Sequence, residues 1–398
     1  MLSRRSLLTV TGATGVAAAT APWWSSALTS SASAASKAPE TCELVLENTG
    51  GGKLNAYITG HEFGTDKWIL IKADSSKYYL EEPGGPNTPL PEDCSIPVES
   101  STTLTLPRMY GSRVYFCRED TLEFFVNPGP SLVEPSFANE ADANFPKIWS
   151  FCEFTFNDQQ LYSNISYVDL VTALPIGLTL EGDTSTTVDP LPEGAVEAVA
   201  ADLKAQAEAD GQPWDQLVLA GDSGGVLRCI APQALGEDAF SGYWDSYVDQ
   251  VWQKYAGEDL KVDIQGGGGV FTGRVEGDTL TFNDGHTFSK PVSTDIFTCN
   301  SGPFANNPDD PDAKKGILAR VAAAFNRSTV LDFPDQPSGP SPEDYYKGDI
   351  TNHWARIVHA NSPIGYAFPY DDVQGDGHPD QSGAAHDGNP SRWTVRAG

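Results

Sequence analysis

Short runs of alternating apolar and polar residues, separated by Gly, Pro, Asn and Asp turns, dominate the chain between residues 40 and 182. A period of two residues is typical of strands that bury one face, and no helical periodicity interrupts it here. This spacing predicts a β-sandwich or β-barrel. The expected strands are 44–46, 55–58, 68–71, 102–106, 113–117, 122–126 and 149–156.

The pattern changes after residue 189, where apolar positions recur every three or four residues, which predicts amphipathic helices. The expected helices are 192–209, 240–255 and 312–325. Between them, the dipeptides Gly277-Asp278 and Asp284-Gly285 are hairpin signals and indicate short strands on either side. The expected strands are 216–220, 226–229, 261–264, 270–275, 279–282 and 287–289.

Together the two patterns predict a mainly β protein with an α+β insertion. A mixed α/β unit over 185–326 interrupts a β unit that is built from residues 38–184 and 327–398. Within the second flank, a Pro-rich connection is followed from residue 345 by an aromatic, turn-rich pattern that favours β structure.

The first residues are typical of an export signal. Arg4 and Arg5 are followed by a mildly apolar stretch and by the small residues Ala32, Ser33 and Ala34, as in twin-arginine signal peptides. We therefore expect residues 1–34 to be a signal peptide and the mature protein to be secreted; the alternative is a disordered tail. No stretch approaches the eighteen apolar residues of a membrane-spanning helix, so no membrane partner is expected.

Acidic residues outnumber basic ones by 54 to 25, a formal net charge of −29. Nucleic acids and anionic membranes require basic surface, which argues against both as partners. The six cysteines all follow the expected cleavage site, and an even count in an exported chain predicts up to three disulfides, with fifteen pairings open. No CxxC or HExxH motif occurs, so no metal site is expected, and we expect a monomer.

Two motifs have structural readings that we favour over functional ones. Asp371, Asp372, Asp376 and Asp380 lie in a Gly-broken stretch without EF-hand spacing, which predicts a solvated turn rather than a calcium site. The segment 221–225 (GDSGG) matches the nucleophile loop of trypsin-like proteases, but it sits between two expected strands of the α/β unit. A Gly-rich turn is therefore the better interpretation.

The segment 149–171 carries the candidate chemistry. It reads as two strands joined by a turn near residues 158–160, with Asn157 expected opposite Leu161. In this register Glu153 shares a polar face with five other residues, whereas the opposite face is apolar; a slip of one residue would put Glu153 and Asp169 on opposite sides. The five are Thr155, Asn157, Ser163, Tyr167 and Asp169.

Glu153 and Asp169 would then lie about 13 Å apart along an ideal strand. Sheet twist or a bulge would bring the carboxyl groups to the roughly 6.5–9.5 Å of an inverting glycosidase, in which one acid protonates the leaving oxygen and the other activates water. A pair of acids on a strand is otherwise a solvated face.

Distinctive short motifs recur along nearly the whole mature chain. They are 113–116 (RVYF), 124–130 (FFVNPGP), 150–157 (SFCEFTFN), 161–169 (LYSNISYVD), 174–178 (LPIGL), 352–356 (NHWAR) and 366–373 (YAFPYDDV). Together they resemble the laminaripentaose-producing β-1,3-glucanases of glycoside hydrolase family 64, and the last motif is also similar to thaumatin-like proteins.

The resemblance implies an inverting endo-hydrolase of β-1,3-glucan, with Glu153 as the acid and Asp169 as the base. It implies a thaumatin-like β-barrel or sandwich beside an α/β domain, flanking a wide groove, and no cofactor. The residues expected to bind glucan are Thr155, Asn157, Tyr162, Tyr167 and Asp372. Some relatives are expected to have Trp at position 162, which leaves the product length open. The alternative is a thaumatin-like module that binds glucan without cleaving it.

Overall fold

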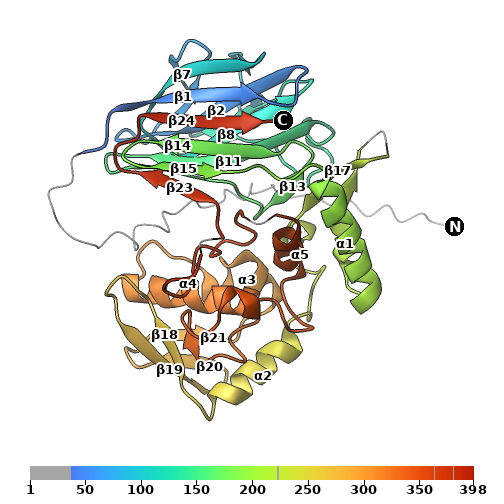
Figure 1. Cartoon of the computed structure of the whole chain (residues 1–398), viewed down its shortest axis with the longest axis vertical. Helices are drawn as coiled ribbons and strands as arrows, with labels where there is room; N and C mark the ends of the chain where they lie inside the picture. The colour runs from blue at the N-terminus through green and yellow to red at the C-terminus, as the bar shows by residue number, and fades with distance from the viewer. Residues whose placement is uncertain (1–36, 222–223, 363, 380) are drawn as a thin grey trace.

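The structure is a computed structural model that describes residues 37–221, 224–362, 364–379 and 381–398. The predicted signal peptide and residues 222–223 of the GDSGG segment lie outside the described residues. Figure 1 shows a β-sandwich above an α/β unit, with strands from both ends of the chain in the sandwich. None of the described helices is long and apolar enough to cross a bilayer.

Two sheets form the sandwich. The smaller has the strand order β15-β14-β24-β1-β7, and the larger β23-β12-β11-β8-β2-β3-β4, with the short β6 also pairing with β2. The smaller sheet consists of β15 (Ser185–Val188), β14 (Ile176–Glu181), β24 (Arg392–Ala397), β1 (Thr41–Asn48) and β7 (Ser101–Pro107). The larger sheet consists of β23 (Ala384–Asp387), β12 (Leu161–Asn164), β11 (Ile148–Phe156), β8 (Met109–Arg118), β2 (Leu54–Glu62), β3 (Trp68–Ile71), β4 (Lys77–Tyr79) and β6 (Ile96–Pro97).

The alternating residues of these strands build the core between the two sheets. Leu44 on β1 and Phe154 and Phe156 on β11 are at most 3% exposed and belong to one buried cluster. The ring of Phe154 lies 4.9 Å from that of Trp393 on β24, so the sheets pack directly on each other. One face of β11 is thus buried in the core, and the other face is available for polar side chains.

Part of that other face carries a second, smaller core. Tyr115, Trp149 and Phe151 form it together with residues of the segment 120–137, which covers this end of the sheet. Within this segment, β9 (Phe125–Asn127) and β10 (Ser131–Val133) form a small sheet with β5 (Thr88–Pro89), which comes from earlier in the chain. The remaining end of the face is left to the polar and aromatic residues described below.

The α/β unit contains a five-stranded sheet of order β21-β20-β19-β18-β22 and several helices. Its strands are β18 (Leu260–Asp263), β19 (Val270–Glu276), β20 (Thr279–Phe282), β21 (Thr287–Ser289) and β22 (Asp335–Gln336). The helices are α1 (Ala195–Asp210), α2 (Asp245–Tyr255), α3 (Ser293–Thr298), α4 (Asp312–Asn326) and α5 (His353–Asn361). A three-stranded sheet of β13 (Leu170–Thr172), β17 (Val226–Ile230) and β16 (Val218–Ala220) lies between the two units (Figure 1).

Most predicted elements are confirmed, with two exceptions in the second half of the chain. The short helix α3 was not expected, and α5 occupies a segment for which β structure was predicted. Helix α5 packs against α1, where Arg356 donates a hydrogen bond to Gln206. Of the C-terminal flank, β23 and β24 join the sandwich, whereas β22 pairs with β18 of the α/β unit.

The predicted disulfides are wrong. All six cysteines lie within the described residues, and each is a buried free thiol. The thiols pack as small apolar side chains, and some also hydrogen-bond the backbone, as Cys299 does with the carbonyl oxygen of Ile296. Burial raises the pKa of Cys42 to about 12, which makes the thiolate scarce at neutral pH.

Candidate active site

Glu153 lies near the middle of β11 and points away from the sandwich core. Its partners in the sheet are Asn164 on β12 and Arg113 on β8, and Arg113 in turn pairs with Thr59 on β2. Directly paired residues share a face of the sheet, so these four side chains form a row across four strands. In the centre of the sheet, the row thus places the carboxyl group of Glu153 beside the guanidinium of Arg113.

The predicted register of the β11–β12 hairpin is wrong by one residue. Phe156, not Asn157, pairs with Leu161. The side chain of Asn157 instead builds the turn, because its Oδ1 accepts hydrogen bonds from the backbone N–H groups of Gln159 and Gln160, at 2.8 and 2.9 Å. A slip of one residue exchanges the faces of the second strand.

The corrected register changes which residues of β12 accompany Glu153. Tyr162 now pairs with Thr155 and joins the polar face, together with Asn164. Ser163 moves to the core side, where it is fully buried and its hydroxyl donates to the carbonyl oxygen of Glu153 at 3.0 Å. The hydroxyl groups of Tyr162 and Tyr366 lie 2.8 Å apart, which ties β12 to the C-terminal segment.

The position of Asp169 relative to Glu153 does not follow from strand periodicity, because Asp169 lies outside the strands. Strand β12 ends at Asn164, and Asp169 occupies a bend directly before β13. The backbone between them is held by bonds to another segment, because the N–H of Tyr167 donates to the carbonyl oxygen of Tyr366 at 2.6 Å. The carbonyl oxygen of Asp169 itself accepts from the N–H of Ala231, after β17.

Asp169 is half-buried, and its carboxyl group interacts electrostatically with Arg113 and Glu153 in the row on the sheet. Burial raises the pKa of Asp169 from 3.8 to about 6; the positive charge of Arg113 lowers it and the negative charge of Glu153 raises it further. The structure therefore brings the two predicted acids into one electrostatic cluster. A carboxyl group with a pKa near 6 is largely ionised at neutral pH and still readily protonated, as a general base requires.

Arg113 lies at the centre of this cluster. Its Nε and Nη2 donate to Oε1 of Glu153 at 3.3 and 3.2 Å, and its Nη1 donates to Glu134 and to the hydroxyl of Tyr115, both at 3.1 Å. The guanidinium also stacks over the ring of Phe151, 4.4 Å from its centre. The rings and two hydrogen-bonded arms fix its orientation.

Glu134 is a third carboxylate that the sequence did not single out. It lies near the end of the covering segment, directly before Pro135, and its side chain points to the sheet. There its Oε1 accepts a hydrogen bond from Thr59 at 3.1 Å. The side chains of Glu134 and Glu153 are 24% and 25% exposed. Arg113 thus forms hydrogen bonds with Glu134 and Glu153 and interacts electrostatically with Asp169. The cluster carries a net negative charge when all three carboxyl groups are ionised.

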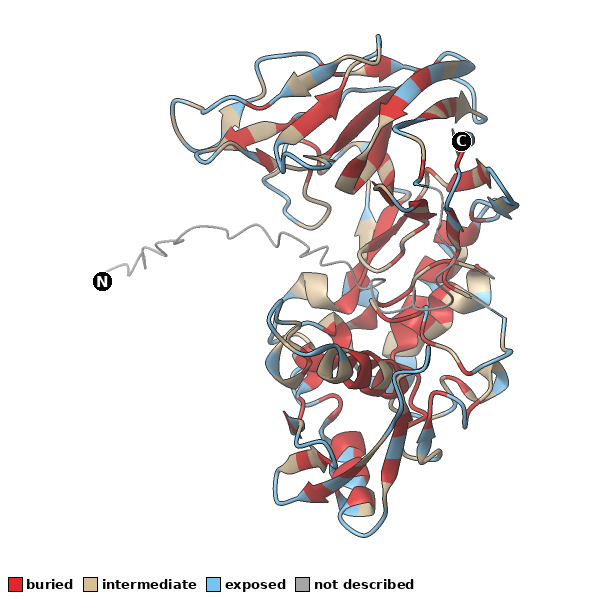
Figure 2. Cartoon of the chain, turned by 90° about the vertical axis from the view of Figure 1, so that its left-hand side faces the viewer, coloured by how far each residue is buried: buried red, intermediate tan, exposed pale blue. Residues whose placement is uncertain are grey.

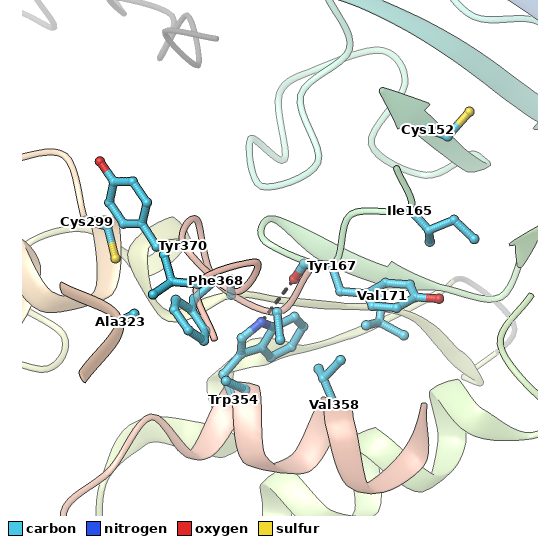
Figure 3. Close-up of a cluster of buried hydrophobic side chains, with 14 of the residues drawn as sticks. Cys152, Ile165, Tyr167, Val171, Cys299, Ala323, Trp354, Val358, Phe368 and Tyr370 are labelled. Carbon is cyan, nitrogen blue, oxygen red and sulfur yellow. Dashed lines mark hydrogen bonds between the residues drawn. The ribbon is translucent and has the colours of Figure 1, made fainter. Parts of the chain in front are cut away.

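Tyr167 was expected on the polar face, and this prediction is wrong. It is 5% exposed and lies in the core beside Ile165 and Val171 (Figure 3). Its carbonyl oxygen accepts a hydrogen bond from the indole Nε1 of Trp354 at 3.1 Å (Figure 3). Burial raises the pKa of its hydroxyl, in line with a structural role.

The two aspartates of the C-terminal motif behave differently. Asp372 is exposed, and its negative charge raises the pKa values of Arg320 and Tyr370 against the other influences on them. Asp371 is fully buried and accepts hydrogen bonds from Arg327 at 3.0 Å, from His359 at 2.7 Å and from the N–H of Ala367 at 2.9 Å. Its oxygens are therefore occupied by protein donors.

Nothing in the described part of the chain groups three His, Cys, Asp or Glu side chains in a way that could hold a metal ion. In the candidate site the positive charge that offsets the carboxylates is supplied by Arg113. Hydrolysis by a pair of carboxyl groups requires no further cation, because both proton transfers are made by side chains.

A glutamate held by Arg113 on the sheet face and an aspartate with a raised pKa that is coupled to it resemble the two carboxyl groups of one class of enzymes, the glycosidases. The comparison with known proteins narrows this class. A family model described as beta-1,3-glucanase, glycoside hydrolase family 64, matches residues 40–397. The chain belongs to this family, and it is an endo-1,3-β-glucanase.

Individual relatives agree with this assignment. Glucan endo-1,3-beta-glucosidases of Cellulosimicrobium cellulans and of Arthrobacter sp. are each 31% identical over 392 residues, which cover 94% of this chain and 68% of theirs. A laminaripentaose-producing beta-1,3-glucanase, solved with laminaritetraose, is 30% identical with a TM-score of 0.78, covering 90% of this chain and 98% of that one. A family 64 domain of Clostridium beijerinckii shares the fold at 22% identity, with a TM-score of 0.71 and the same coverage of 90% and 98%.

Proposed function

We propose that the protein is a secreted, inverting endo-β-1,3-glucanase that cuts linear β-1,3-glucan into short oligosaccharides, with laminaripentaose as the main product. The observation that supports this most is the coupling of Glu153 and Asp169 around one arginine, with the pKa of Asp169 raised to about 6. The thaumatin-like architecture and the wide groove inferred from the sequence belong to this proposal. The substrate would lie across the polar face of the larger sheet.

In the proposed reaction Glu153 is the general acid. Both hydrogen bonds from Arg113 end on its Oε1, so among the described residues Oε2 is left to carry the proton. That proton passes to the glycosidic oxygen as the bond to the anomeric carbon breaks. Arg113 also donates to Glu134, so the guanidinium holds Glu153 in a fixed orientation between two elements of the site.

Asp169 is the general base. It removes a proton from a water molecule that attacks the anomeric carbon from the face opposite the leaving oxygen, which inverts the configuration. The oxocarbenium-like transition state carries positive charge, and the excess negative charge of the cluster favours it electrostatically. Thr155 and Tyr162 lie beside Glu153 on the same face and are suited to bind the hydroxyl groups of the neighbouring sugars.

Product length and export are the parts of the proposal that rest on other evidence. The laminaripentaose product is supported by the 30% identity to the laminaripentaose-producing enzyme. Export is supported by the paired Arg4 and Arg5, and replacing both with Lys in the producing cell should retain the protein inside.

The acid role is tested by Glu153→Gln. The amide keeps the shape of the side chain but holds no transferable proton, so release of oligosaccharides from insoluble β-1,3-glucan should fall by about 10²-fold or more while binding to the polymer is retained. Glu258→Gln, in the exposed turn that follows α2, is the matched control and should keep full activity. Undiminished hydrolysis by Glu153→Gln would remove this residue as the acid.

A further inference from the structure

Three aromatic rings lie side by side near the turn that joins β2 and β3. The ring centre of His61 lies 5.2 Å from that of Tyr110, with 20° between the planes, and 4.1 Å from that of Trp68, with 43° between the planes. All three side chains are only partly buried. We call His61, Trp68 and Tyr110 the aromatic platform.

The aromatic platform lies on the same face of the sheet as Glu153. In the pairing of β8 with β11, Ser112 and Met109 stand opposite core residues, so the bulge between them turns Tyr110 to the side of Arg113. His61 pairs with Tyr110, and Trp68 pairs with His61. The rings therefore continue the polar face across β8, β2 and β3.

Gly60 on β2 allows the two strands to approach closely at this bulge. Gly60 precedes His61, and a Cβ atom at this position would lie 2.1 Å from the hydroxyl oxygen of Ser112. Only glycine allows β2 and β8 to approach in this way, and the approach sets the direction of His61 and Tyr110.

The turn residue Asp66 braces two of the rings. Its carboxylate accepts a hydrogen bond from the hydroxyl of Tyr110 at 2.9 Å, and its carbonyl oxygen lies 3.1 Å from Nδ1 of His61. Asp66 has a positive φ of 57°, so the turn holds it in a conformation that non-glycine residues rarely adopt. Rings that are fixed before a ligand arrives lose little conformational entropy on binding.

We propose that the aromatic platform is a distal subsite on which the sugar rings of a β-1,3-glucan strand stack while another part of the same strand lies at Glu153. Flat rings with polar edges suit the apolar C–H faces of pyranose units and their hydroxyl groups. This inference rests on the proposed function.

The aromatic platform and Glu153 lie on one continuous sheet face. The ligand of the platform is therefore a β-1,3-glucan chain that also reaches Glu153 and Asp169. With strands about 4.8 Å apart and residues about 3.4 Å apart, the platform begins about 8 Å from the Cα of Glu153 and extends to about 16 Å. A sugar chain of several units spans this distance. The subsite thus favours long polysaccharide over short oligosaccharides.

The test compares ring removal with ring retention at Tyr110. Tyr110→Leu should weaken binding of the full-length enzyme to insoluble linear β-1,3-glucan about fivefold to tenfold and raise KM on this polymer with kcat unchanged. Tyr110→Phe keeps the ring face and loses only the hydrogen bond to Asp66, so it should weaken polymer binding much less than Tyr110→Leu. Trp68→Leu, which keeps an apolar side chain but removes the indole, should weaken polymer binding about as much as Tyr110→Leu.

Tyr79→Leu is the matched control. Tyr79 is 40% exposed, yet it pairs with the core residue Ile69 and so points to the opposite side of the sheet from Trp68. Its polymer KM should not change. The subsite would be refuted if Tyr110→Leu and Trp68→Leu, with wild-type thermal unfolding, bound and cut the polymer like the wild type. Failure of the wild-type enzyme to cut β-1,3-glucan would instead refute the proposed function.

Discussion

Removal of the charge of Arg113 should move the acidic limb of the pH–rate profile to higher pH. Asp169 acts as a base only when it is ionised, and its pKa is about 6. The ionised fraction is then about one-tenth at pH 5 and about nine-tenths at pH 7, so kcat/KM of the wild type should rise roughly tenfold between these values.

In Arg113→Met the cation that lowers the pKa of Asp169 is absent. A neighbouring opposite charge is worth about one unit at a partly exposed site, which places the limb of the variant near pH 7. The ionised fraction at pH 6 then falls from about half to about one-tenth, a loss of about fivefold that shrinks to less than about 1.3-fold at pH 8. A further loss at every pH is expected because Arg113 also orients Glu153.

The assay is kcat/KM on soluble β-1,3-glucan between pH 4.5 and 8.5, chosen around the limb expected at about pH 6. Arg113→Lys keeps the charge without the two-armed hydrogen bond, so its limb should stay near that of the wild type while its rate falls. Arg274→Met, at an exposed ion pair on β19, is the control. An acidic limb that does not move in Arg113→Met would refute the electrostatic coupling.

Three further predictions concern stability and covalent state. Asp169→Asn should raise the free energy of unfolding by about 3 kcal/mol at pH 8 and by almost nothing at pH 3.5: the native pKa of about 6 exceeds the unfolded value, so the cost of ionisation is absent below pH 3.8 and is complete above pH 6. Denaturant melts at the two pH values check this, and equal gains at both would contradict it. Asp371→Ala leaves Arg327 buried without its carboxylate partner and should destabilise the fold by about 3–5 kcal/mol, which a thermal melt would reveal; an unchanged melting temperature would contradict that role. Denatured, unreduced mature protein should titrate six thiols with a chromogenic disulfide reagent, and fewer would indicate disulfides.

Sequence periodicity was sufficient for the strands that pack in the sandwich. Each expected strand of the β unit overlaps an observed one, because alternation follows directly from burying one face. The segment of α5 was mistaken for β structure, since its aromatic and polar residues resemble turn-rich neighbours. Its start has a local signal, as the side chain of Asn352 accepts a hydrogen bond from the N–H of Ala355 and caps the helix.

Two acids of the candidate site, Glu153 and Asp169, were singled out from the sequence, whereas Glu134 and the geometry of the site were not. Glu153 and Asp169 were identified as a pair, but the register between β11 and β12 depends on Asn157 folding into the turn, which a pattern of apolar residues does not specify. Asp169 is positioned by backbone contacts with distant segments. Glu134 lies 19 residues before Glu153 in the sequence and meets it only through Arg113.

The stereochemistry of the first product tests the central claim most directly. If Asp169 activates water on the face opposite the bond that Glu153 protonates, proton NMR during the first minutes of hydrolysis should show the α-anomer accumulating before mutarotation. Initial appearance of the β-anomer would mean that a covalent intermediate forms, and it would contradict the assignment of Glu153 and Asp169 as the acid and base of an inverting enzyme.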